Sequence, residues 1–575
     1  MNWRGRVSDL NEAQFDGFET EWPEIILSIL AARGVTNSEA VKNTLEPSLK
    51  DLRHPYDLAD MERACERLAL ALSNQETIAV YGDFDLDGTS GLALLVSGLR
   101  DFGFQNIIPY QPKRLSEGYG FHAHAVDALK QQGVSLIVTV DVGITDVKAC
   151  QRANEMGVDV IITDHHLPKQ HLPEAYAIVN PNSGQCTSKL QHLCGAGVGY
   201  YLLLGLRVHL QSLGEKVAFD PKSVLDFFAI GTVTDMVPLV DENRVLVQHG
   251  LHRLRTKPRP GFATLMKKLG VVSKNLTAKE LAIRVAPKLN ALSRLEEGLT
   301  PYMVYSVETV EEAEALIDKV VQQNDRRVHL QRLAEEMAEF DAEETVSSGY
   351  VFSASEDYHQ GVVGLVATKM TQKFGVPSFI GAIKDGGQVV GSARRPDGLE
   401  LSLLDGLEAA KDHLVKFGGH AAASGFEMDV EQVEGFKQAL AGFYGKPVDG
   451  RPVGSIDYDV AIDLSVADSY LMKWIERLQP FGAGFESPVF RFDGLKLTSV
   501  KLLKEIHLKV QVAQGGARLD ALWFSLGGEQ LELAQGLSIG DHVDALGELG
   551  WNEFAGRRSL QLTLLDLRRS TRGPS

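Results

Sequence analysis

Three aspartates stand close together after a short apolar run: Asp83, Asp85 and Asp87 follow residues 77–80. Carboxylates at this spacing repel one another unless a positive charge lies among them, and the simplest such charge in solution is a divalent metal ion. A second apolar run, 92–96, follows the acids, and exposed acidic turns rarely lie between two apolar runs. The stretch therefore favours a metal site at the carboxyl end of a buried strand.

Two known motifs also match this stretch by itself. An EF-hand calcium loop opens with Asp-x-Asp-x-Asp-Gly, but it needs a bidentate Glu at its twelfth position, where this chain has Leu94. The signature of the haloacid dehalogenases, Asp-x-Asp-Gly-Thr, would make Asp85 a covalent nucleophile. A solvated acidic turn is a third alternative. Taken alone, the stretch leaves the nucleophile and the metal-ligand interpretations open.

Three later apolar stretches also end in acidic residues. The residues at these ends are Asp141, then Asp164 with His165 and His166, and finally Asp235. An acid after a strand is often a helix N-cap, so Asp141 or Asp235 taken singly is weak support. Four such strand ends in one domain are harder to attribute to chance. Carboxylates with one or two imidazoles make a typical site for Mn²⁺ or Mg²⁺.

The elements that position these residues follow from an alternation of apolar and helical segments. We expect strands at 77–85, 106–111, 135–141, 158–163 and 176–180, and helices at 90–102, 123–132 and 145–156. Such an alternation is typical of a parallel sheet with helices on both faces. Ligands gather at the carboxyl ends of the strands in such a sheet, which is where the acids are expected.

Composition sets broader limits. A chain of 575 residues predicts two to four domains, and 44% hydrophobic with 23% charged residues is typical of a globular protein. The net charge of −18 argues against broad binding to duplex DNA, although a narrow basic channel could still bind nucleic acid selectively. No apolar run reaches the ~18 residues of a membrane span. Four scattered cysteines and the absence of a signal-peptide core favour a cytoplasmic protein.

The segments around the acids resemble the motifs of the DHH phosphoesterase family. These segments are Asp83-Phe84-Asp85-Leu86-Asp87-Gly88, Asp141-Val142-Gly143, Asp164-His165-His166 and Gly231-Thr232-Val233-Thr234-Asp235. The resemblance favours metal-ligand roles for these acids over a covalent nucleophile at Asp85, because a haloacid dehalogenase does not require an Asp-His-His sequence.

The resemblance implies a centre with two divalent metal ions, Mn²⁺ or Mg²⁺. The implied ligands are Asp83 and Asp85 for one ion, Asp87, His165 and Asp235 for the other, and Asp141 as the bridge. His166 would face the scissile phosphate, and Asp164 would orient its neighbours. Two ions ~4 Å apart can activate water, hold a phosphate and stabilise the leaving oxygen. The implied chemistry is phosphodiester hydrolysis, with His166, Asp141 and Asp164 as catalytic residues.

Four further segments, 112–120, 179–182, 193–199 and 285–291, resemble the single-strand-specific exonucleases of this family. The implied activity is 5′-to-3′ digestion of single-stranded DNA to mononucleotides in repair and recombination. The implied partners are single-stranded DNA, a single-strand-binding protein and a recombination helicase, with the chain acting as a monomer. One alternative is an enzyme of the same superfamily for short oligonucleotides or cyclic dinucleotides. Another is an inactive scaffold, although all the expected ligands are present.

Five regions follow from these observations. They are a helical cap at 1–75, a DHH catalytic domain at 76–306, a connecting helix at 307–346, a DHHA1 substrate-binding domain at 347–446 and an OB-like nucleic-acid-binding domain at 453–568. The predicted fold class is α/β, with two α/β domains joined by a long helix and a C-terminal OB-type β-barrel.

Contacts to nucleic acid are expected from three of these regions. By resemblance, the contact residues are Arg114, Tyr119, Lys288, Asn290 and Arg294 in the catalytic domain, His359, Ser392, Arg394, Arg395, Gly418, Gly419 and His420 in the DHHA1 domain, and His507 and Lys509 in the barrel. Arginine forks can clamp phosphate oxygens, and glycines let backbone N–H groups approach an anion. Small barrels hold single strands with basic and aromatic side chains.

Overall fold

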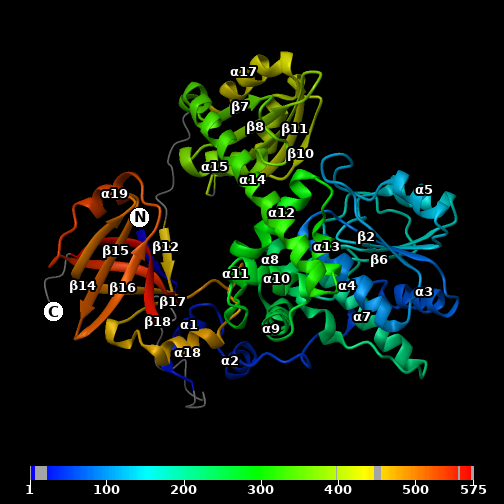
Figure 1. Ribbon diagram of the computed structural model, residues 1–575, viewed down its shortest axis with the longest axis horizontal. Helices are drawn as coiled ribbons and strands as arrows, with labels where there is room; N and C mark the ends of the chain where they lie inside the picture. The colour runs from blue at the N-terminus through cyan, green and yellow to red at the C-terminus, as the bar shows by residue number, and fades with distance from the viewer. Residues whose placement is uncertain are drawn as a thin grey trace. The chain divides into compact units, whose positions relative to one another are not determined.

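The computed structural model describes residues 2–6, 22–396, 398–399, 401–445, 455–554 and 557–570 (Figure 1). Contacts between residues divide the chain into two units. The larger unit consists of Arg53–Val237 and His249–Pro452, and the smaller unit of Met1–Leu52, Pro238–Gln248 and Val453–Ser575. Among the helices of the described ranges, none combines the length and the apolar character needed to cross a membrane.

A five-stranded parallel sheet lies at the centre of the first part of the larger unit. Its strands, in spatial order, are β3 (Ile107–Tyr110), β2 (Ile78–Gly82), β4 (Leu136–Val140), β5 (Asp159–Thr163) and β6 (Ala177–Val179). Every residue of β2 and β4 is buried, as expected for strands covered on both faces. The expected parallel sheet is confirmed, although its first strand already ends at Gly82 and not at Asp85.

Helices cover both faces of this sheet. They are α4 (Leu86–Phe102), α5 (Ala123–Gln131), α6 (Val147–Glu155) and α7 (Gly195–Ser212). α5 and α6 share an apolar core with Ile137 of β4 and Ile162 of β5. The side chain of Val140 points to the other face, where Gly91 of α4 and Gly199 of α7 leave room for it. The glycines thus let two helices approach the sheet at the end that carries the acids.

The rest of this part is helical. Its helices are α3 (Met61–Ser73), α8 (Leu225–Asp235), α9 (Asp241–Thr256) from His249 onward, α10 (Pro260–Lys268), α11 (Ala278–Glu280), α12 (Ala286–Leu295) and α13 (Pro301–Ser306). The prediction of a strand end at Asp235 is wrong, because this residue is the last of α8. Every residue of α8 up to Thr232 is buried. A segment without a polar face has no periodicity that separates a buried helix from a buried strand.

A single helix, α14 (Val310–Thr345), leads into a second α/β region. At 1.5 Å per residue, its 36 residues span about 54 Å. The sheet that follows has the order β10 (Lys416–Gly419), β11 (Ala423–Asp429), β9 (Gln388–Arg394), β8 (Ser378–Ile383) and β7 (Val351–Ser355). Only β7 and β8 are parallel among these neighbours. The expected connecting helix and second α/β domain are therefore present.

Helices also cover both faces of the second sheet. α15 (Val363–Phe374) packs with α14 on one face, and α16 (Leu403–Ala409) and α17 (Val433–Tyr444) share the core on the other face. The strands β10 and β11 were not predicted, since their glycines lower strand propensity. The expected domain limits at 446 and 453 lie outside the described residues.

The smaller unit contains a closed five-stranded barrel. Its strands are β14 (Val489–Leu503), β15 (His507–Gln514), β16 (Ala517–Trp523), β18 (Arg557–Arg569) and β17 (His542–Phe554), and β17 pairs back onto β14. The short strands β12 (Ser455–Tyr458) and β13 (Val460–Ala461) precede it, with α18 (Ser469–Arg477) and α19 (Gly528–Gln535) beside it. This barrel confirms the expected OB-type fold.

The N-terminal segment belongs with this barrel. Strand β1 (Asn2–Gly5) pairs in parallel with β12, and α1 (Glu24–Ala31) and α2 (Ser38–Leu45) contribute to the apolar core of the barrel. The expected helical cap over 1–75 differs from this grouping, because only residues beyond Leu52 join the larger unit. A pairing between strands more than 400 residues apart leaves no local signal in the sequence.

Candidate metal centre

The first candidate ligands lie where the chain passes from β2 into α4. Asp83 directly follows β2, and Asp85 is the N-cap of α4. Asp85 Oδ1 accepts hydrogen bonds from the backbone N–H groups of Asp87 (2.9 Å) and Gly88 (3.0 Å). Asp87 therefore lies in the first turn of the helix. Asp83 and Asp85 therefore lie beyond the strand, whereas the sequence predicted both within it.

Asp141 directly follows β4 and has a φ of 65°. This left-handed conformation is uncommon outside glycine and is found preferentially at functional sites. The backbone N–H of Asp141 donates to the carbonyl oxygen of Thr163 (2.9 Å), which ties the residue to β5. A Cβ atom at Gly195, the first residue of α7, would lie 2.6 Å from Asp141 Oδ1. Glycine is therefore required for α7 to begin against this carboxylate.

Asp87 caps the same end of α7. Its carboxylate oxygens accept hydrogen bonds from the backbone N–H groups of Gly195 (2.6 Å) and Ala196 (3.0 Å). The residue before α7, Cys194, provides no side-chain cap. A negative charge is stabilised at a helix N-terminus by the N–H groups and the helix dipole. This contact fixes the Asp87 carboxylate in a buried position beside the other acids.

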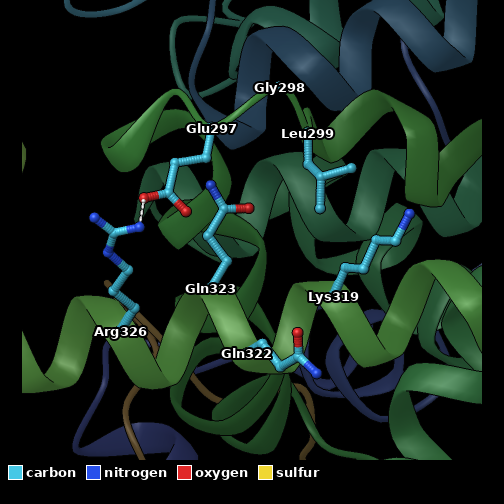
Figure 2. Close-up of a pocket in the computed structure, with 7 residues that line it drawn as sticks. All are labelled: Glu297, Gly298, Leu299, Lys319, Gln322, Gln323 and Arg326. Carbon is cyan, nitrogen blue, oxygen red and sulfur yellow. Dashed lines mark ion pairs between the residues drawn. The ribbon is translucent and has the colours of Figure 1, made fainter.

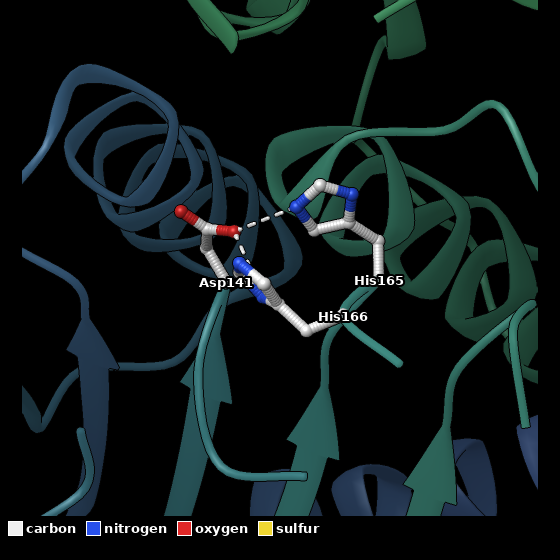
Figure 3. Close-up of side chains that lie close together, drawn as sticks. All are labelled: Asp141, His165 and His166. Atoms are coloured by element: carbon white, nitrogen blue, oxygen red, sulfur yellow. Dashed lines mark ion pairs between the residues drawn. The ribbon is translucent and has the colours of Figure 1, made fainter. Parts of the chain in front are cut away.

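The carboxylates converge on His165. Its Nε2 atom lies 3.1 Å from Asp141 Oδ1, 3.7 Å from Asp235 Oδ2 and 3.9 Å from Asp87 Oδ2. Figure 3 shows His165 and His166 directed at the same oxygen of Asp141. His165 Nε2, Asp141 Oδ1 and Asp235 Oδ2 are buried without a hydrogen-bond partner among the described residues. Such atoms need an explanation, and one cation between them would satisfy all three.

The described residues contain three groups of candidate ligands, and within each group the ligand atoms lie within 4.8 Å of one another. They are Asp83 with Asp85 and Asp141, Asp87 with His165 and Asp235, and Asp141 with His165 and His166. Asp141 belongs to two of these groups. Carboxylate oxygens with an imidazole suit Mn²⁺ and Mg²⁺, so the donor set fits the implied ions. The structure brings all six predicted ligands together, and their binding of metal stays a prediction.

The buried carboxylates destabilise one another when no cation is bound. Burial, followed by the charge of Asp85, raises the pKa of Asp83 well above its ordinary value. Burial and the charges of Asp87 and Asp85 raise the pKa of Asp141 in the same way. For Asp235, burial and the same two neighbours raise the pKa to about 8. A divalent ion would oppose these shifts because it stabilises the charged carboxylates.

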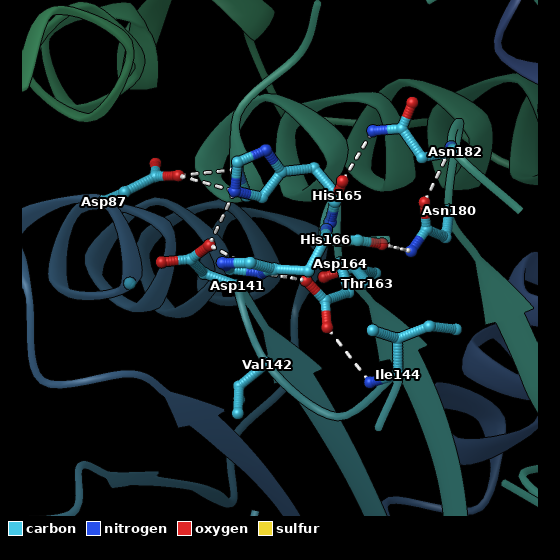
Figure 4. Close-up of polar contacts among 12 residues, drawn as sticks. Asp87, Asp141, Val142, Ile144, Thr163, Asp164, His165, His166, Asn180 and Asn182 are labelled. Carbon is cyan, nitrogen blue, oxygen red and sulfur yellow. Dashed lines mark hydrogen bonds and ion pairs between the residues drawn. The ribbon is translucent and has the colours of Figure 1, made fainter. Parts of the chain in front are cut away.

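Asp164 is fully buried and holds the histidine loop. Its Oδ1 accepts hydrogen bonds from His166 Nδ1 (2.8 Å) and from the backbone N–H of His165 (2.8 Å), and its Oδ2 accepts one from the backbone N–H of Ile144 (3.0 Å) (Figure 4). Burial opposes the charged form of His166, but the hydrogen bond and the charge of Asp164, together with the charges of Asp235 and Asp87, raise the pKa of His166 to about 9. His166 is therefore cationic at neutral pH.

Three amide side chains support these loops, and two of them lie in the segment 179–182 that resembles the exonucleases of this family. Asn180 Nδ2 donates to the carbonyl oxygen of His166 (2.9 Å), and Asn182 Nδ2 donates to that of His165 (Figure 4). Gln111 Nε2 donates to the carbonyl oxygen of Asp83 (2.6 Å). The Asn-Pro-Asn sequence after β6 was a detectable signal, since turn-forming residues at a strand end often fix a loop.

Two predicted nucleic-acid contacts lie directly at the metal centre. The Arg114 guanidinium is 4.9 Å from the centre of the Phe84 ring, within the first acidic motif. Tyr119 Oη lies 3.3 Å from His166 Nδ1, and its side chain is exposed. Their contact with a substrate phosphate stays a prediction.

Other arginines extend this positive region. Burial, followed by the charges of Arg114, Arg327 and Arg394, lowers the pKa of Arg294 to about 9. Arg294 Nη1 is 3.5 Å from the carbonyl oxygen of Gly361, so α12 meets the DHHA1 region here. Guanidinium groups that lower a neighbour's pKa in this way suit a bound phosphate. Arg327 was missed because the sequence of α14 resembles that of a solvated connector.

The remaining predicted contacts of the catalytic region lie on the same helix as Arg294. Lys288 and Asn290 both belong to α12. Burial, followed by the charge of Arg327, lowers the pKa of Lys288. The carbonyl oxygen of Asn290 accepts a hydrogen bond from the Ser293 hydroxyl (3.3 Å). Their contact with nucleic acid stays a prediction.

Four predicted contact residues of the DHHA1 region make different hydrogen bonds. Arg394 Nη1 donates to Ser392 Oγ (2.7 Å), and these residues lie on β9. Arg395 Nη1 instead donates to the carbonyl oxygen of Leu401 (3.2 Å). His359 Nδ1 accepts a hydrogen bond from the backbone N–H of Gly361 (3.0 Å), next to the Arg294 contact.

The Gly-Gly-His segment is an exposed strand end and not only a tight turn. Gly418 and Gly419 belong to β10 and pair with β11. Gly419 has a φ of 139°, and a Cβ there would lie 2.5 Å from the carbonyl oxygen of Ala423. The backbone N–H of His420 donates to that same oxygen (2.8 Å). Gly419 is therefore needed for close strand pairing, whatever further role it has.

The two barrel residues lie in the smaller unit, on β15. His507 Nδ1 accepts a hydrogen bond from the backbone N–H of Ser525 (2.9 Å), and its ring centre is 5.7 Å from that of the exposed Phe524. Lys509 Nζ lies 3.2 Å from a carboxylate oxygen of Asp520. A basic side chain beside an exposed aromatic ring is typical of a single-strand platform.

Comparison with known protein families gives three matches along the chain. Residues 77–232 match the DHH family, N-terminal domain, residues 347–446 match the DHHA1 domain, and residues 458–566 match the RecJ OB domain. The first match contains five of the six candidate ligands, and Asp235 follows it.

Relatives and solved structures extend these matches over the whole chain. The single-stranded-DNA-specific exonuclease RecJ of Salmonella typhimurium is 33% identical over 95% of this chain and 96% of its own length. The Mn²⁺ complex of RecJ from Thermus thermophilus is 27% identical, with a TM-score of 0.81 over 100% of this chain and 80% of that one. The Mg²⁺ complex of the same protein, at 25% identity, gives a TM-score of 0.74 over 100% and 79%. With the metal-ligand geometry, these matches show that the chain belongs to the RecJ family of DHH phosphoesterases.

Proposed function

We propose that the protein is a metal-dependent exonuclease that digests single-stranded DNA from the 5′ end to mononucleotides, in DNA repair and recombination. Members of its family carry the name single-stranded-DNA-specific exonuclease, which supplies the reaction and the substrate class. The observation that carries the proposal is the position of Asp141, whose carboxylate belongs to two ligand groups at the edge of the sheet. A residue shared in this way is what a two-metal phosphoesterase requires.

Two Mn²⁺ or Mg²⁺ ions are the proposed cofactors. Asp83 and Asp85 would hold one ion, Asp87, His165 and Asp235 the other, and Asp141 both. When bound, such ions supply a nucleophilic water and charge stabilisation for the phosphate. One buried oxygen each of Asp83, Asp141 and Asp235 lacks a hydrogen-bond partner within the described part of the chain, which supports this assignment because the oxygens are available to a cation.

The side chains around the metal centre would hold the substrate. His166, kept cationic and oriented by Asp164, would donate a hydrogen bond from Nε2 to an oxygen of the scissile phosphate. Arg114, Arg294 and Arg394 would bind the phosphates at the strand end, because arginine forks match phosphate oxygens. Tyr119 lies beside His166, where it can contact the terminal nucleotide.

Several wider assignments belong to the same proposal. The catalytic domain would comprise 76–306 and the DHHA1 domain 347–446, with the barrel at 453–568 holding the strand through His507 and Lys509. The protein would act in the cytoplasm as a monomer, with a single-strand-binding protein and a recombination helicase as partners. The family resemblance supports these assignments.

Digestion of end-labelled DNA tests the proposed direction. A long single strand carries the label at its 5′ end in one reaction and at its 3′ end in another, each with and without Mn²⁺. We expect early release of the 5′ label as a mononucleotide, only with metal present. Early loss of the 3′ label would contradict the direction but leave the phosphoesterase chemistry intact. Equal rates on a duplex of the same length would contradict the substrate.

A further inference from the structure

A cavity of about 440 Å³ lies between α14 and the loop that follows α12 (Figure 2). The loop contributes Glu297 and Leu299, and α14 contributes Lys319, Gln323 and Arg326. Its volume falls within the ~300–1,000 Å³ that is typical of small-molecule sites. The sequence pattern of α14 predicts only a connecting role for this segment, so the cavity is an unassigned feature of the larger unit.

Gln323 distinguishes this cavity from an ordinary surface depression. The residue is only 5% exposed, and Figure 2 shows its amide directed from α14 toward Glu297 and Leu299. Neither its amide nitrogen nor its amide oxygen has a hydrogen-bond partner among the described residues. Burying an unpaired amide destabilises a fold, and leucine at a helical position would avoid this cost. The chain therefore keeps a donor and an acceptor here against its own stability.

The charges around the cavity favour an anionic ligand. Arg326 Nη1 lies 2.6 Å from Glu297 Oε1 at one side, and Lys319 stands at the other (Figure 2). Two cations against one carboxylate leave a net positive charge. Burial, followed by the charge of Arg326, lowers the pKa of His359, so the cavity lies close to a residue expected to bind nucleic acid.

The cavity is connected to the metal centre through neighbouring segments. Glu296, which precedes Glu297, accepts a hydrogen bond from the backbone N–H of Leu115. Leu115 follows Arg114, whose guanidinium lies over Phe84 of the first acidic motif. The loop that lines the cavity is therefore held against the segment that places Arg114 beside the first acidic motif.

We propose that this cavity is a subsite for one nucleotide of the single strand, with the base edge on the Gln323 amide and the phosphate near Lys319 and Arg326. The proposal rests on the proposed exonuclease function. An amide offers one acceptor and two donors, and base edges present both kinds of group. A phosphate alone has only acceptors and would leave the Gln323 oxygen unpaired. Leu299 gives the base an apolar surface.

A coupling experiment between protein and substrate tests this subsite. Single strands that each lack one base, at successive positions from the 5′ end, are digested by the wild-type protein and by Gln323→Leu. We expect the wild type to lose on the order of ten-fold in kcat/KM at one internal position, which is typical of one or two lost hydrogen bonds. The variant should be slower on the intact strand and insensitive to base removal at that position.

Gln372→Leu, which replaces an exposed glutamine of α15, is the matched control and should retain the full position dependence. Thermal melting adds a second readout. Gln323→Leu should melt at the same or a higher temperature, whereas an amide with a structural role would lower it. Additive effects of base removal and Gln323→Leu at every position would overturn the subsite, while digestion of intact strands by the wild type would leave the proposed function standing.

Discussion

The contact between Gly195 and Asp141 gives the most demanding prediction for the metal centre. A Cβ at residue 195 would lie 2.6 Å from both Cα and Oδ1 of Asp141, whereas ordinary contacts begin at 3.4 Å. Gly195→Ala must therefore push α7 and Asp141 apart by about 1 Å, a displacement that can cost ~100-fold in rate at a catalytic group. The same movement strains the hydrogen bond from the Gly195 N–H to Asp87.

We expect Gly195→Ala to reduce kcat by about 100-fold, to weaken Mn²⁺ binding, and to destabilise the fold by ~1–3 kcal/mol through overpacking. Single-strand digestion, Mn²⁺ calorimetry and thermal melting measure the three effects. Gly442→Ala is the matched control, because this helical glycine of α17 has no atom within 4 Å of the added Cβ. That variant should be active and as stable as the wild type or more so. If Gly195→Ala binds Mn²⁺ with wild-type affinity, then glycine is not required where α7 begins against Asp141.

Three further predictions follow from the same geometry. Asp164→Asn should lower activity by about 100-fold or more while retaining most Mn²⁺ affinity, because the substitution removes a charge that keeps His166 cationic. An unchanged pH–rate profile would contradict this role of Asp164. The metal-free protein should melt at a lower temperature at pH 8 than at pH 5, and Mn²⁺ should abolish the difference. The pKa of Asp235 is raised to about 8, so its contribution to stability is present at low pH and is lost as the pH rises toward that value; equal melting temperatures would argue against this burial. Arg294→Ala should raise KM for single strands at least ten-fold, with a smaller change in kcat, and should reduce the salt dependence of binding. An unchanged KM would show that Arg294 does not bind the substrate.

The sequence predicted that the candidate ligands lie close together, because they belong to compact motifs at the ends of consecutive elements. Asp83, Asp141 and His165 could be grouped from the sequence alone, since parallel strands bring their carboxyl ends to one edge. Asp235 was grouped correctly for the wrong local reason, because an entirely apolar segment hides whether it is a helix or a strand. The need for Gly195 could not be foreseen, since it depends on where α7 approaches the sheet.

Features that depend on distant contacts were missed. Strand β1 pairs with β12, and no local sequence pattern indicates a pairing across most of the chain. Arg327 and Gln323 lie on α14, whose polar residues resemble those of any solvated helix. The burial of Gln323 and the partial burial of Arg327 become visible only when α12 and its following loop pack against α14. Sequence patterns report the period of an element, and they do not report which polar face another element will cover.

Calorimetric titration of Mn²⁺ into the wild-type protein and into Asp141→Asn tests directly whether Asp141 is shared by two metal ions. We expect two ions for each wild-type chain. In the variant we expect the loss of at least one ion and a much lower affinity for the other, because Asp141 belongs to two ligand groups. Binding of two ions by Asp141→Asn with wild-type affinity would contradict the proposed metal centre.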